Sequence, residues 1–313
     1  MILEQYQEIK FRKDTLGLIA LANQIIENYQ AQGLDLTLRQ LYYRLVAADV
    51  IPNKQTEYDR LGRIISDARL AGLVAWDAIV DRTRNMKANP HWGTPGEIMQ
   101  AAASGYARDK WADQIYRPVV LVEKEALEGV VAQIGDQLDV PYEACKGYFS
   151  QSEMWGLAKR CLRWMKKSRG AHTNPRGQHP IILHLGDHDP SGIDMTRDIQ
   201  DRLEMFCGCP IVVRRLALNM PQIEQYDPPP NPAKQTDSRF SDYADKFGDE
   251  SWELDALEPD VLMELISDAV SEYRDDEKWE RAVRREARER KVLEAAAGNW
   301  NRVEQLFASS LEE

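Results

Sequence analysis

Three carboxylates follow apolar segments that are typical of buried strands. Glu123 ends the segment RPVVLVE, and Asp187 and Asp189 follow PIILHLG in the run DHDPSG. Because the carboxyl ends of neighbouring parallel strands lie at one edge of a sheet, these side chains are expected to converge there. Carboxylate oxygens without regularly spaced His or Cys favour Mg2+ over zinc. The pattern predicts a Mg2+ site formed by Glu123, Asp187 and Asp189; the alternative is an Asp-rich turn that caps the next helix.

A pair of tyrosines lies in the helical segment LTLRQLYYRLV, residues 36–46. At about 100° per residue, Tyr42 falls within the apolar stripe, whereas Tyr43 and Arg39 share a more exposed face. A tyrosine hydroxyl has a pKa near 10, so its attack on a phosphodiester needs a cation beside it. Arg39 and a metal ion would supply that charge. We therefore predict Tyr43 as a nucleophile with Arg39 as its companion; the alternative is an ordinary packing tyrosine.

The segments around the tyrosine pair predict a small helical domain. Apolar residues recur at helical spacing in three stretches, and the segment LVAWDAIVDRTR after them is hairpin-like. Three helices followed by a hairpin outline a winged-helix domain, a frequent DNA-binding module. The three stretches are 14–32, a helix beginning in 36–50, and 57–72.

The segments around the carboxylates predict a different domain. Beyond residue 116, apolar strands and amphipathic helices alternate four times, which predicts an α/β domain with a parallel sheet and helices on both faces. The strands are expected in 117–123, 141–147, 180–186 and 210–218. The expected divisions are a winged-helix domain at 1–85, a linker at 86–116, the sheet domain at 117–226, and a loop with helices packed on that domain at 227–313.

The charge is unevenly distributed along the chain. The formal net charge of -11 argues against a nucleic-acid partner if it is taken as a whole. However, 16 acidic and only 4 basic residues lie in 227–277, and 154–186 holds 7 basic residues without any acid. This distribution weakly favours DNA, although a charged run is also what a solvated face looks like. The residues predicted to contact DNA are Arg39, Arg60, Arg63, Arg69 and Lys124.

The apolar stretches, the N-terminal segment and the cysteines limit the class of protein. The apolar stretches are shorter than the roughly 20 residues of a membrane span, and the opening MILEQYQEIKFRKD is unlike a signal peptide. The four cysteines offer neither a disulfide framework nor zinc-ligand spacing. We expect a soluble, cytoplasmic protein with reduced thiols and no membrane partner.

Together these motifs resemble a known family. RQLYYRL in a winged-helix setting, VEKEAL, LGDHDPSGIDM and the later WELDAL look like the A subunit of topoisomerase VI and the related meiotic double-strand-break transesterase. The order of elements is similar from about residue 35 to 265. The Glu and D-x-D-P-x-G pair of the Toprim fold, a Rossmann-like parallel sheet, is the most specific part of this resemblance. Stand-alone mini-A homologues share the general layout.

The resemblance implies a function for these residues. It assigns Tyr43 to attack of the DNA backbone, leaving a 5'-phosphotyrosyl link, with Arg39 as companion and Mg2+ held by Glu123, Asp187 and Asp189. It also implies a homodimer on double-stranded DNA and, for strand passage, a separate ATPase subunit, since this chain carries no ATPase module. Two alternatives stay open, a Toprim nuclease that hydrolyses DNA with metal-activated water and a non-enzymatic DNA-binding protein.

Overall fold

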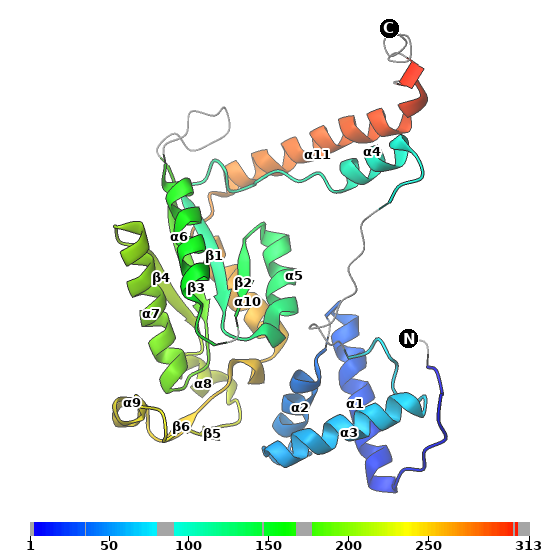
Figure 1. Ribbon diagram of the computed structural model, residues 1–313, viewed down its shortest axis with the longest axis vertical. Coiled ribbons are helices and arrows are strands. Elements are labelled where there is room, and N and C mark those ends of the chain that lie inside the picture. Colours follow the sequence, from blue (N-terminus) through cyan, green and yellow to red (C-terminus); the bar gives the residue numbers. More distant parts are fainter. Residues whose placement is uncertain are drawn as a thin grey trace.

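The N-terminal part of the protein is helical in the computed structural model, which describes residues 3–34, 36–79, 91–145, 147–166, 177–302 and 304–305. Helices α1 (Lys13–Ala31), α2 (Leu38–Ala47) and α3 (Gln55–Leu70) pack together around a shared apolar core (Figure 1). Thr37 begins α2 in a capping box with Gln40, which satisfies orphan amides at that end. The three helices of the predicted N-terminal domain are thus present.

The structure does not form the predicted hairpin in the part of the segment after α3 that it describes. Residues 73–79 form turns and bends, and the rest of the predicted hairpin lies outside the described residues. An isolated antiparallel bridge instead joins Gln5 to Ala71. The apolar residues of this segment, including Val74 and Ile79, are buried in the helical core. Their hydrophobicity therefore reflects packing against the helices, and a wing is not shown.

The predicted parallel sheet is confirmed. Its strands are β1 (Tyr116–Val122), β2 (Tyr142–Ala144), β3 (His179–Leu185) and β4 (Val212–Ala217), all parallel in the order β2-β1-β3-β4. In the register of the central pair, Val122 lies opposite Leu185. The two central strands therefore end at the same level, and the residues that follow them are neighbours.

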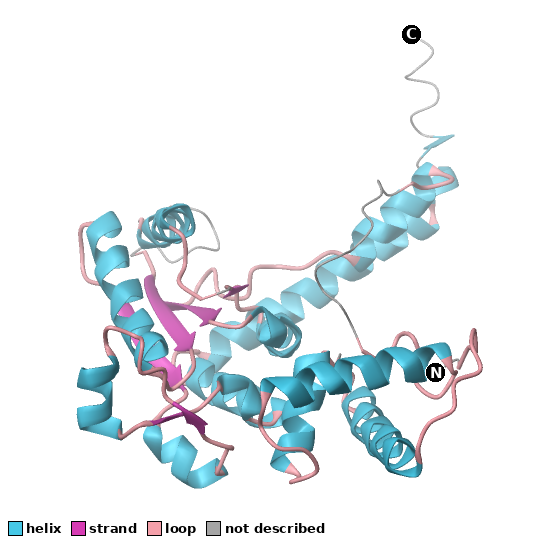
Figure 2. Cartoon of the chain, turned by 60° about the horizontal axis from the view of Figure 1, so that its bottom comes forward, coloured by secondary structure: helices cyan, strands magenta, loops and turns pink. Residues whose placement is uncertain are grey.

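Two layers of helices cover the sheet (Figures 1 and 2). Val119, Leu121 and Ile182 pack against α6 (Gln151–Met165) and α7 (Pro190–Cys207). The alternate residues, such as Val120 and Leu183, belong to the core that contains α5 (Glu128–Leu138) and α10 (Pro259–Ser271). Successive side chains of a strand point to opposite faces, so both faces of these apolar strands are buried.

The segment after β4 wraps around the carboxyl edge of the sheet. It contains α8 (Met220–Tyr226), α9 (Phe240–Phe247), the short antiparallel pair β5 (Asn231–Pro232) and β6 (Glu250–Ser251), and the 3-10 turn η2 (Leu254–Ala256). A second 3-10 turn, η1 (Glu125–Leu127), leads from the sheet edge into α5. The Pro-rich stretch is therefore ordered, as its position before a helix predicts.

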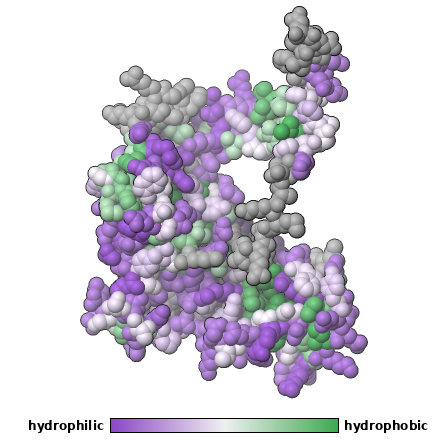
Figure 3. Space-filling view, in the orientation of Figure 1, coloured by the Kyte–Doolittle hydropathy of each residue, from purple (hydrophilic) through white to green (hydrophobic). Residues whose placement is uncertain are grey.

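Two helices form an arm that extends from the sheet domain (Figure 1). Helix α11 (Asp276–Gly298) packs along α4 (Pro95–Ser104), which lies in the interval predicted as a linker. Apolar residues are visible on the surface of this arm (Figure 3), and Ile98 and Val292 are exposed. Trp111, also in the predicted linker, is fully buried, with its indole N–H donating to the Leu138 carbonyl. Part of the linker is thus structural, and α11 extends beyond the sheet domain on which it was predicted to pack.

Among the described residues, every helix is too short or too polar to cross a lipid bilayer.

Candidate active site

Glu123 and Asp187 meet at the carboxyl edge of the sheet because β1 and β3 end together. The Asp187 amide donates to Glu123 Oε2 at 2.9 Å, and the Glu123 amide donates to the Leu185 carbonyl. Burial, and then the charge of Asp187, raises the pKa of the Glu123 carboxyl above its usual range. The two residues thus lie side by side at this edge, and the negative charge of one carboxylate disfavours that of the other unless a cation is present. The predicted convergence of these two residues is present.

Asp189 has a different role in this structure. Its carboxylate begins α7 as the N-cap, accepting from the Gly192 amide at 2.6 Å and from the Ser191 hydroxyl at 3.0 Å. This is the capping turn that the sequence offered as an alternative reading of the D-x-D run. A Cβ on Gly192 would lie 2.2 Å from the Asp187 carbonyl oxygen, so the tight turn requires glycine. As a metal ligand, Asp189 remains a prediction.

Arg215, for which the sequence predicts no role, binds the turn of residues 186–189 that contains Asp187 and Asp189, called the acidic turn below. Its guanidinium donates to the carbonyls of Gly186 and Asp187 at 3.0 and 2.6 Å and to that of Gly192 at 2.8 Å. It also donates to the Leu218 carbonyl and the Thr196 hydroxyl. Burial lowers the pKa of Arg215 to about 10, although the neighbouring carboxylates oppose that shift. An arginine inside an apolar strand was a usable signal, because charged residues are rarely buried without partners.

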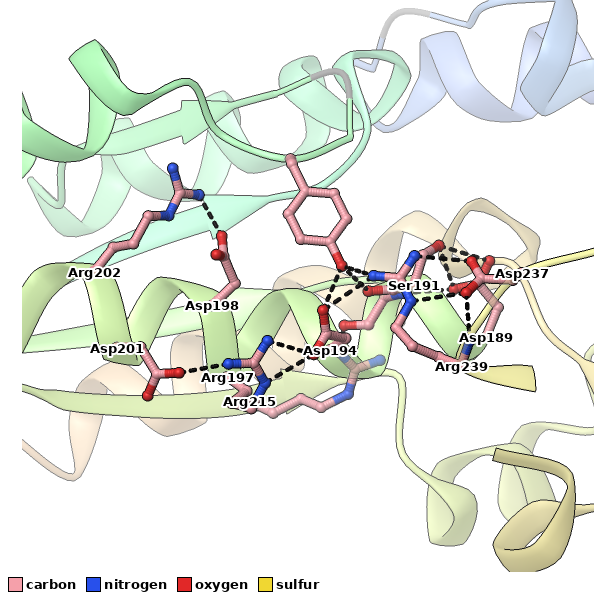
Figure 4. Close-up of polar contacts among 12 residues, drawn as sticks. Asp189, Ser191, Asp194, Arg197, Asp198, Asp201, Arg202, Arg215, Asp237 and Arg239 are labelled. Atoms are coloured by element: carbon pink, nitrogen blue, oxygen red, sulfur yellow. Dashed lines mark hydrogen bonds and ion pairs between the residues drawn. The ribbon is translucent and has the colours of Figure 1, made fainter. Parts of the chain in front are cut away.

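A polar network forms the rim of the acidic turn at the start of α7 (Figure 4). The Tyr148 hydroxyl donates to Asp194 at 2.7 Å, and Arg239 forms ion pairs with Asp194 at 3.0 Å and with Asp237 at 2.8 Å. Arg239 therefore reaches the neighbourhood of Asp189 from the segment after β4. Its charge is compensated by two carboxylates in this structure.

Lys124 lies on the inner side of the acidic turn. Its Nζ contacts Asp187 Oδ1 at 3.0 Å, Glu253 Oε2 at 2.5 Å and Asp255 Oδ1 at 2.7 Å, and only 14% of its side chain is exposed. Burial alone would lower the pKa of Lys124, but these three carboxylates outweigh it and raise the pKa above its usual range. In this structure Lys124 is a counter-ion of three carboxylates, and its contact with DNA stays a prediction.

Arg39 joins the same carboxylates from the N-terminal helices. Its Nε lies 3.2 Å from Asp255 Oδ2, its Nη2 lies 2.7 Å from Glu253 Oε2, and Nη2 also reaches the Tyr43 hydroxyl at 3.5 Å. Arg44, one turn further along α2, pairs with Glu258 and donates to a carbonyl of η2. The WELDAL segment is therefore the surface on which α2 docks.

Tyr43 is buried, which differs from the prediction of a more exposed face. Its exposed fraction is 5%, against 4% for Tyr42, because η2 and the Glu253 side chain cover the face that helical periodicity leaves polar. Burial, then Glu253 and Asp255, raises the pKa of the Tyr43 hydroxyl well above its usual range. The ring nevertheless lines a pocket of about 360 Å³, together with Arg39, Lys54 and Glu253.

The remaining predicted DNA contacts lie on α3. Arg60 is exposed and pairs with Glu57 at 2.7 Å, and Arg63 is exposed on the same helix. Arg69 is partly buried, donates to the Ile79 carbonyl and lies over the Trp76 ring. Arg60 and Arg63 are thus accessible to a phosphate, whereas Arg69 supports the segment that follows α3.

The donor chemistry at the carboxyl edge fits Mg2+ in part. Glu123 and Asp187 are neighbouring carboxylate residues, since the Asp187 amide donates to Glu123 Oε2, and carboxylate oxygens are the ligands that Mg2+ prefers. Lys124 and the Leu254 amide, at 2.7 Å, already contact Asp187 Oδ1, and Asp189 caps α7. Within the ranges that the structure describes, no group of three or more His, Cys, Asp or Glu side chains is arranged as a metal cage. A third protein ligand would require Asp189 to leave its cap.

Comparison with known proteins adds no assignment. The chain matches no protein-family model, and a search of curated proteins found no match.

Proposed function

We propose that this protein is a Mg2+-dependent DNA-cleaving enzyme that uses Tyr43 as its nucleophile. One observation carries the proposal, a continuous set of contacts from the Tyr43 hydroxyl through Arg39, Asp255 and Lys124 to Asp187. These contacts connect Tyr43, Arg39 and the acidic turn in one polar cluster, although more than 140 residues separate Tyr43 from Asp187 in the sequence.

In the proposed reaction, the Tyr43 oxygen forms a bond to the phosphorus of a DNA phosphodiester and the bond to the 3' oxygen breaks. The hydroxyl proton is lost from Tyr43 and the leaving 3' oxygen gains one, so the strand ends in a free 3' hydroxyl. Arg39 would orient the phosphate and stabilise its developing charge. Glu123 and Asp187 would hold Mg2+, which supplies further charge stabilisation at the phosphate when bound.

Hydrolysis is the second candidate, and the burial of Tyr43 favours it. Tyr43 is 5% exposed as a residue, and a buried hydroxyl with a raised pKa is a weak nucleophile unless DNA binding changes its surroundings. A Toprim nuclease in which a metal-activated water attacks the phosphodiester would need the acidic turn but not Tyr43.

The test is detection of a covalent protein-DNA adduct. Labelled duplex DNA is incubated with the protein and Mg2+, denatured, and resolved by gel electrophoresis, and the DNA-linked peptide is mapped by mass spectrometry. Tyr43→Phe should abolish the adduct, whereas Tyr42→Phe should retain it. Cleavage without an adduct that survives Tyr43→Phe would establish hydrolysis instead. Salt-dependent duplex binding without cleavage, unaffected by Asp187→Asn, would identify a non-enzymatic DNA-binding protein.

The resemblance to the A subunit of topoisomerase VI also suggests two partners, a second copy of this chain and a separate ATPase subunit, and each has its own test. A homodimer predicts twice the chain mass in sedimentation equilibrium. A separate ATPase subunit predicts that strand passage, unlike strand cleavage, requires an added partner and ATP.

A further inference from the structure

Arg39 and Lys124 share one carboxylate, although they belong to different parts of the fold. The same oxygen, Glu253 Oε2, lies 2.7 Å from Arg39 Nη2 and 2.5 Å from Lys124 Nζ. Asp255 also bridges the two cations, at 3.2 and 2.7 Å. The two positive charges next to Tyr43 and the acidic turn are therefore held together by a pair of carboxylates.

The two bridging carboxylates differ in their access to solvent. The Asp255 side chain is fully buried, whereas that of Glu253 is 25% exposed and that of Arg39 is 48% exposed. Glu253 also lines the pocket that contains the Tyr43 ring. An anion that enters this pocket meets Glu253 before it meets Asp255, so Glu253 is the exchangeable partner and Asp255 the internal one.

We propose that Glu253 occupies the position of a DNA phosphate between Arg39 and Lys124, and that a phosphate of bound DNA displaces it. This inference rests on the proposed function and assigns its substrate contact. A phosphate presents oxygens that accept from arginine and lysine as a carboxylate does, and a planar guanidinium binds either group. Asp255 remains in place and keeps its contacts with both cations, of which Arg39 lines the pocket.

The charges explain why displacement matters. With Glu253 in place, Arg39 and Lys124 face the carboxylates of Asp187, Glu253 and Asp255, so the cluster carries more negative than positive charge. That balance disfavours a phosphate. Once the Glu253 side chain turns away, the two cations face two carboxylates and accept an additional anion more readily.

The exchange needs only a side-chain rotation, because the backbone on both sides of Glu253 is held. The His188 amide donates to the Trp252 carbonyl at 2.8 Å, and the Trp252 amide donates to the His188 carbonyl at 3.0 Å. The Leu254 amide donates to Asp187 Oδ1 at 2.7 Å. The backbone of Glu253 is therefore fixed while its side chain can rotate. Arg39 Nη2 donates to both Glu253 and the Tyr43 hydroxyl, so rotation of the Glu253 side chain leaves Tyr43 as the partner of that nitrogen.

The experiment measures the affinity of the full-length protein for a labelled DNA duplex by fluorescence anisotropy, without Mg2+ so that cleavage does not interfere. Glu253→Gln should lower Kd about three- to tenfold, because a partly exposed ion-pair partner of two cations is removed. Glu250→Gln removes the same charge from an exposed position three residues earlier and should change Kd by less than about twofold. In an Arg39→Gln background, the gain from Glu253→Gln should largely disappear.

Each result decides the inference. Unchanged or weakened DNA binding by a folded Glu253→Gln variant, with wild-type binding intact, overturns the displacement but leaves the proposed function standing. An equal gain from Glu250→Gln means that net charge alone is responsible and also overturns it. Absence of DNA binding by the wild-type protein refutes the proposed function itself. If thermal unfolding shows that Glu253→Gln does not fold, Glu253→Asp, which withdraws the carboxylate by one methylene, should show a smaller gain, and no gain refutes the inference.

Discussion

Replacing Arg215 by Met should destabilise the sheet domain strongly. The guanidinium makes five hydrogen bonds, four of them to backbone carbonyls of the acidic turn and its neighbours. Met fills a similar apolar volume but leaves those oxygens without their donor. Removal of one partner from a buried charged network costs about 3–5 kcal/mol, and hydrogen bonds to charged groups are worth about 1.5–3 kcal/mol each before the cost of burying the charge.

The neighbouring residue provides a matched control. Arg214 precedes Arg215 on β4 and points to the opposite face, where it pairs with Glu272 at 2.6 Å with both side chains exposed. An exposed pair contributes at most about 1 kcal/mol. Arg214→Met should therefore change the free energy of unfolding by less than that, although the chemical change is identical. Arg215→Lys, which keeps the charge but loses the planar fork, should fall between the two.

The assay is urea unfolding followed by circular dichroism, together with the thermal midpoint. A loss of about 3–5 kcal/mol corresponds to a fall of roughly 6–20 °C in the Tm of a domain of this size. If Arg215→Met and Arg214→Met lose equal free energy, below about 1 kcal/mol, then the acidic turn does not depend on the Arg215 hydrogen bonds and the reasoning is wrong.

Three further predictions concern the same core. Burial and the neighbouring Arg215 guanidinium lower the pKa of His184 to about 3, so the folded protein keeps this imidazole neutral. Its contribution to the free energy of unfolding is fully present above pH 6.5, where the unfolded chain is also neutral, and is lost as the pH falls toward 3. Between pH 7 and pH 4 the free energy of unfolding of the wild type should therefore fall by on the order of 2–3 kcal/mol more than that of His184→Gln. Urea unfolding at a series of pH values measures both, and an equal pH dependence of the two proteins would contradict this. Tyr42→Phe should cost about 1–2 kcal/mol, because its hydroxyl accepts from the Lys54 amide and donates its one proton to Asn53 Oδ1 or the Lys54 carbonyl. Tyr43→Phe, which loses one contact of 3.5 Å, should cost under about 0.5 kcal/mol. If urea unfolding shows a larger loss of stability for Tyr43→Phe than for Tyr42→Phe, this prediction is wrong. Gly192→Ala should destabilise by more than about 2 kcal/mol, since its Cβ would lie 2.2 Å from a backbone oxygen, while Gly156→Ala in open space on α6 should stabilise by about 0.5–1 kcal/mol. Similar thermal midpoints for the two glycine variants would refute the packing argument.

Local patterns predicted the elements of the sheet domain well. Strands β1, β3 and β4 begin and end within two residues of their predicted runs, since a buried strand needs apolar residues on both faces. The partly buried β2 ends three residues before its predicted run does. The meeting of Glu123 and Asp187 was predictable as well, because parallel strands of similar length end at one edge. The helix cap formed by Asp189 was an open alternative, and sequence spacing does not distinguish a ligand from a cap.

Long-range contacts were not predictable from those patterns. Helical periodicity correctly identifies the face of α2 that contains Arg39 as polar, but it does not tell what covers that face. The covering residues, Glu253 and Asp255, lie more than 200 residues away. Tyr43 is therefore buried although its position on the helix is polar, and Lys124 is a counter-ion of carboxylates that lie far from it in the sequence.

The sequence by itself determined the approximate positions of the three N-terminal helices and of the four strands, that the sheet is parallel, and that Glu123 and Asp187 stand at its edge. These properties depend on residue periodicity and turn chemistry, which act over a few residues. Only the tertiary structure decided that α2 docks on η2, that Arg215 holds the acidic turn, and that Arg39 and Lys124 share two carboxylates. Those contacts depend on how whole elements pack, and packing joins residues whose separation in the chain carries no local signal.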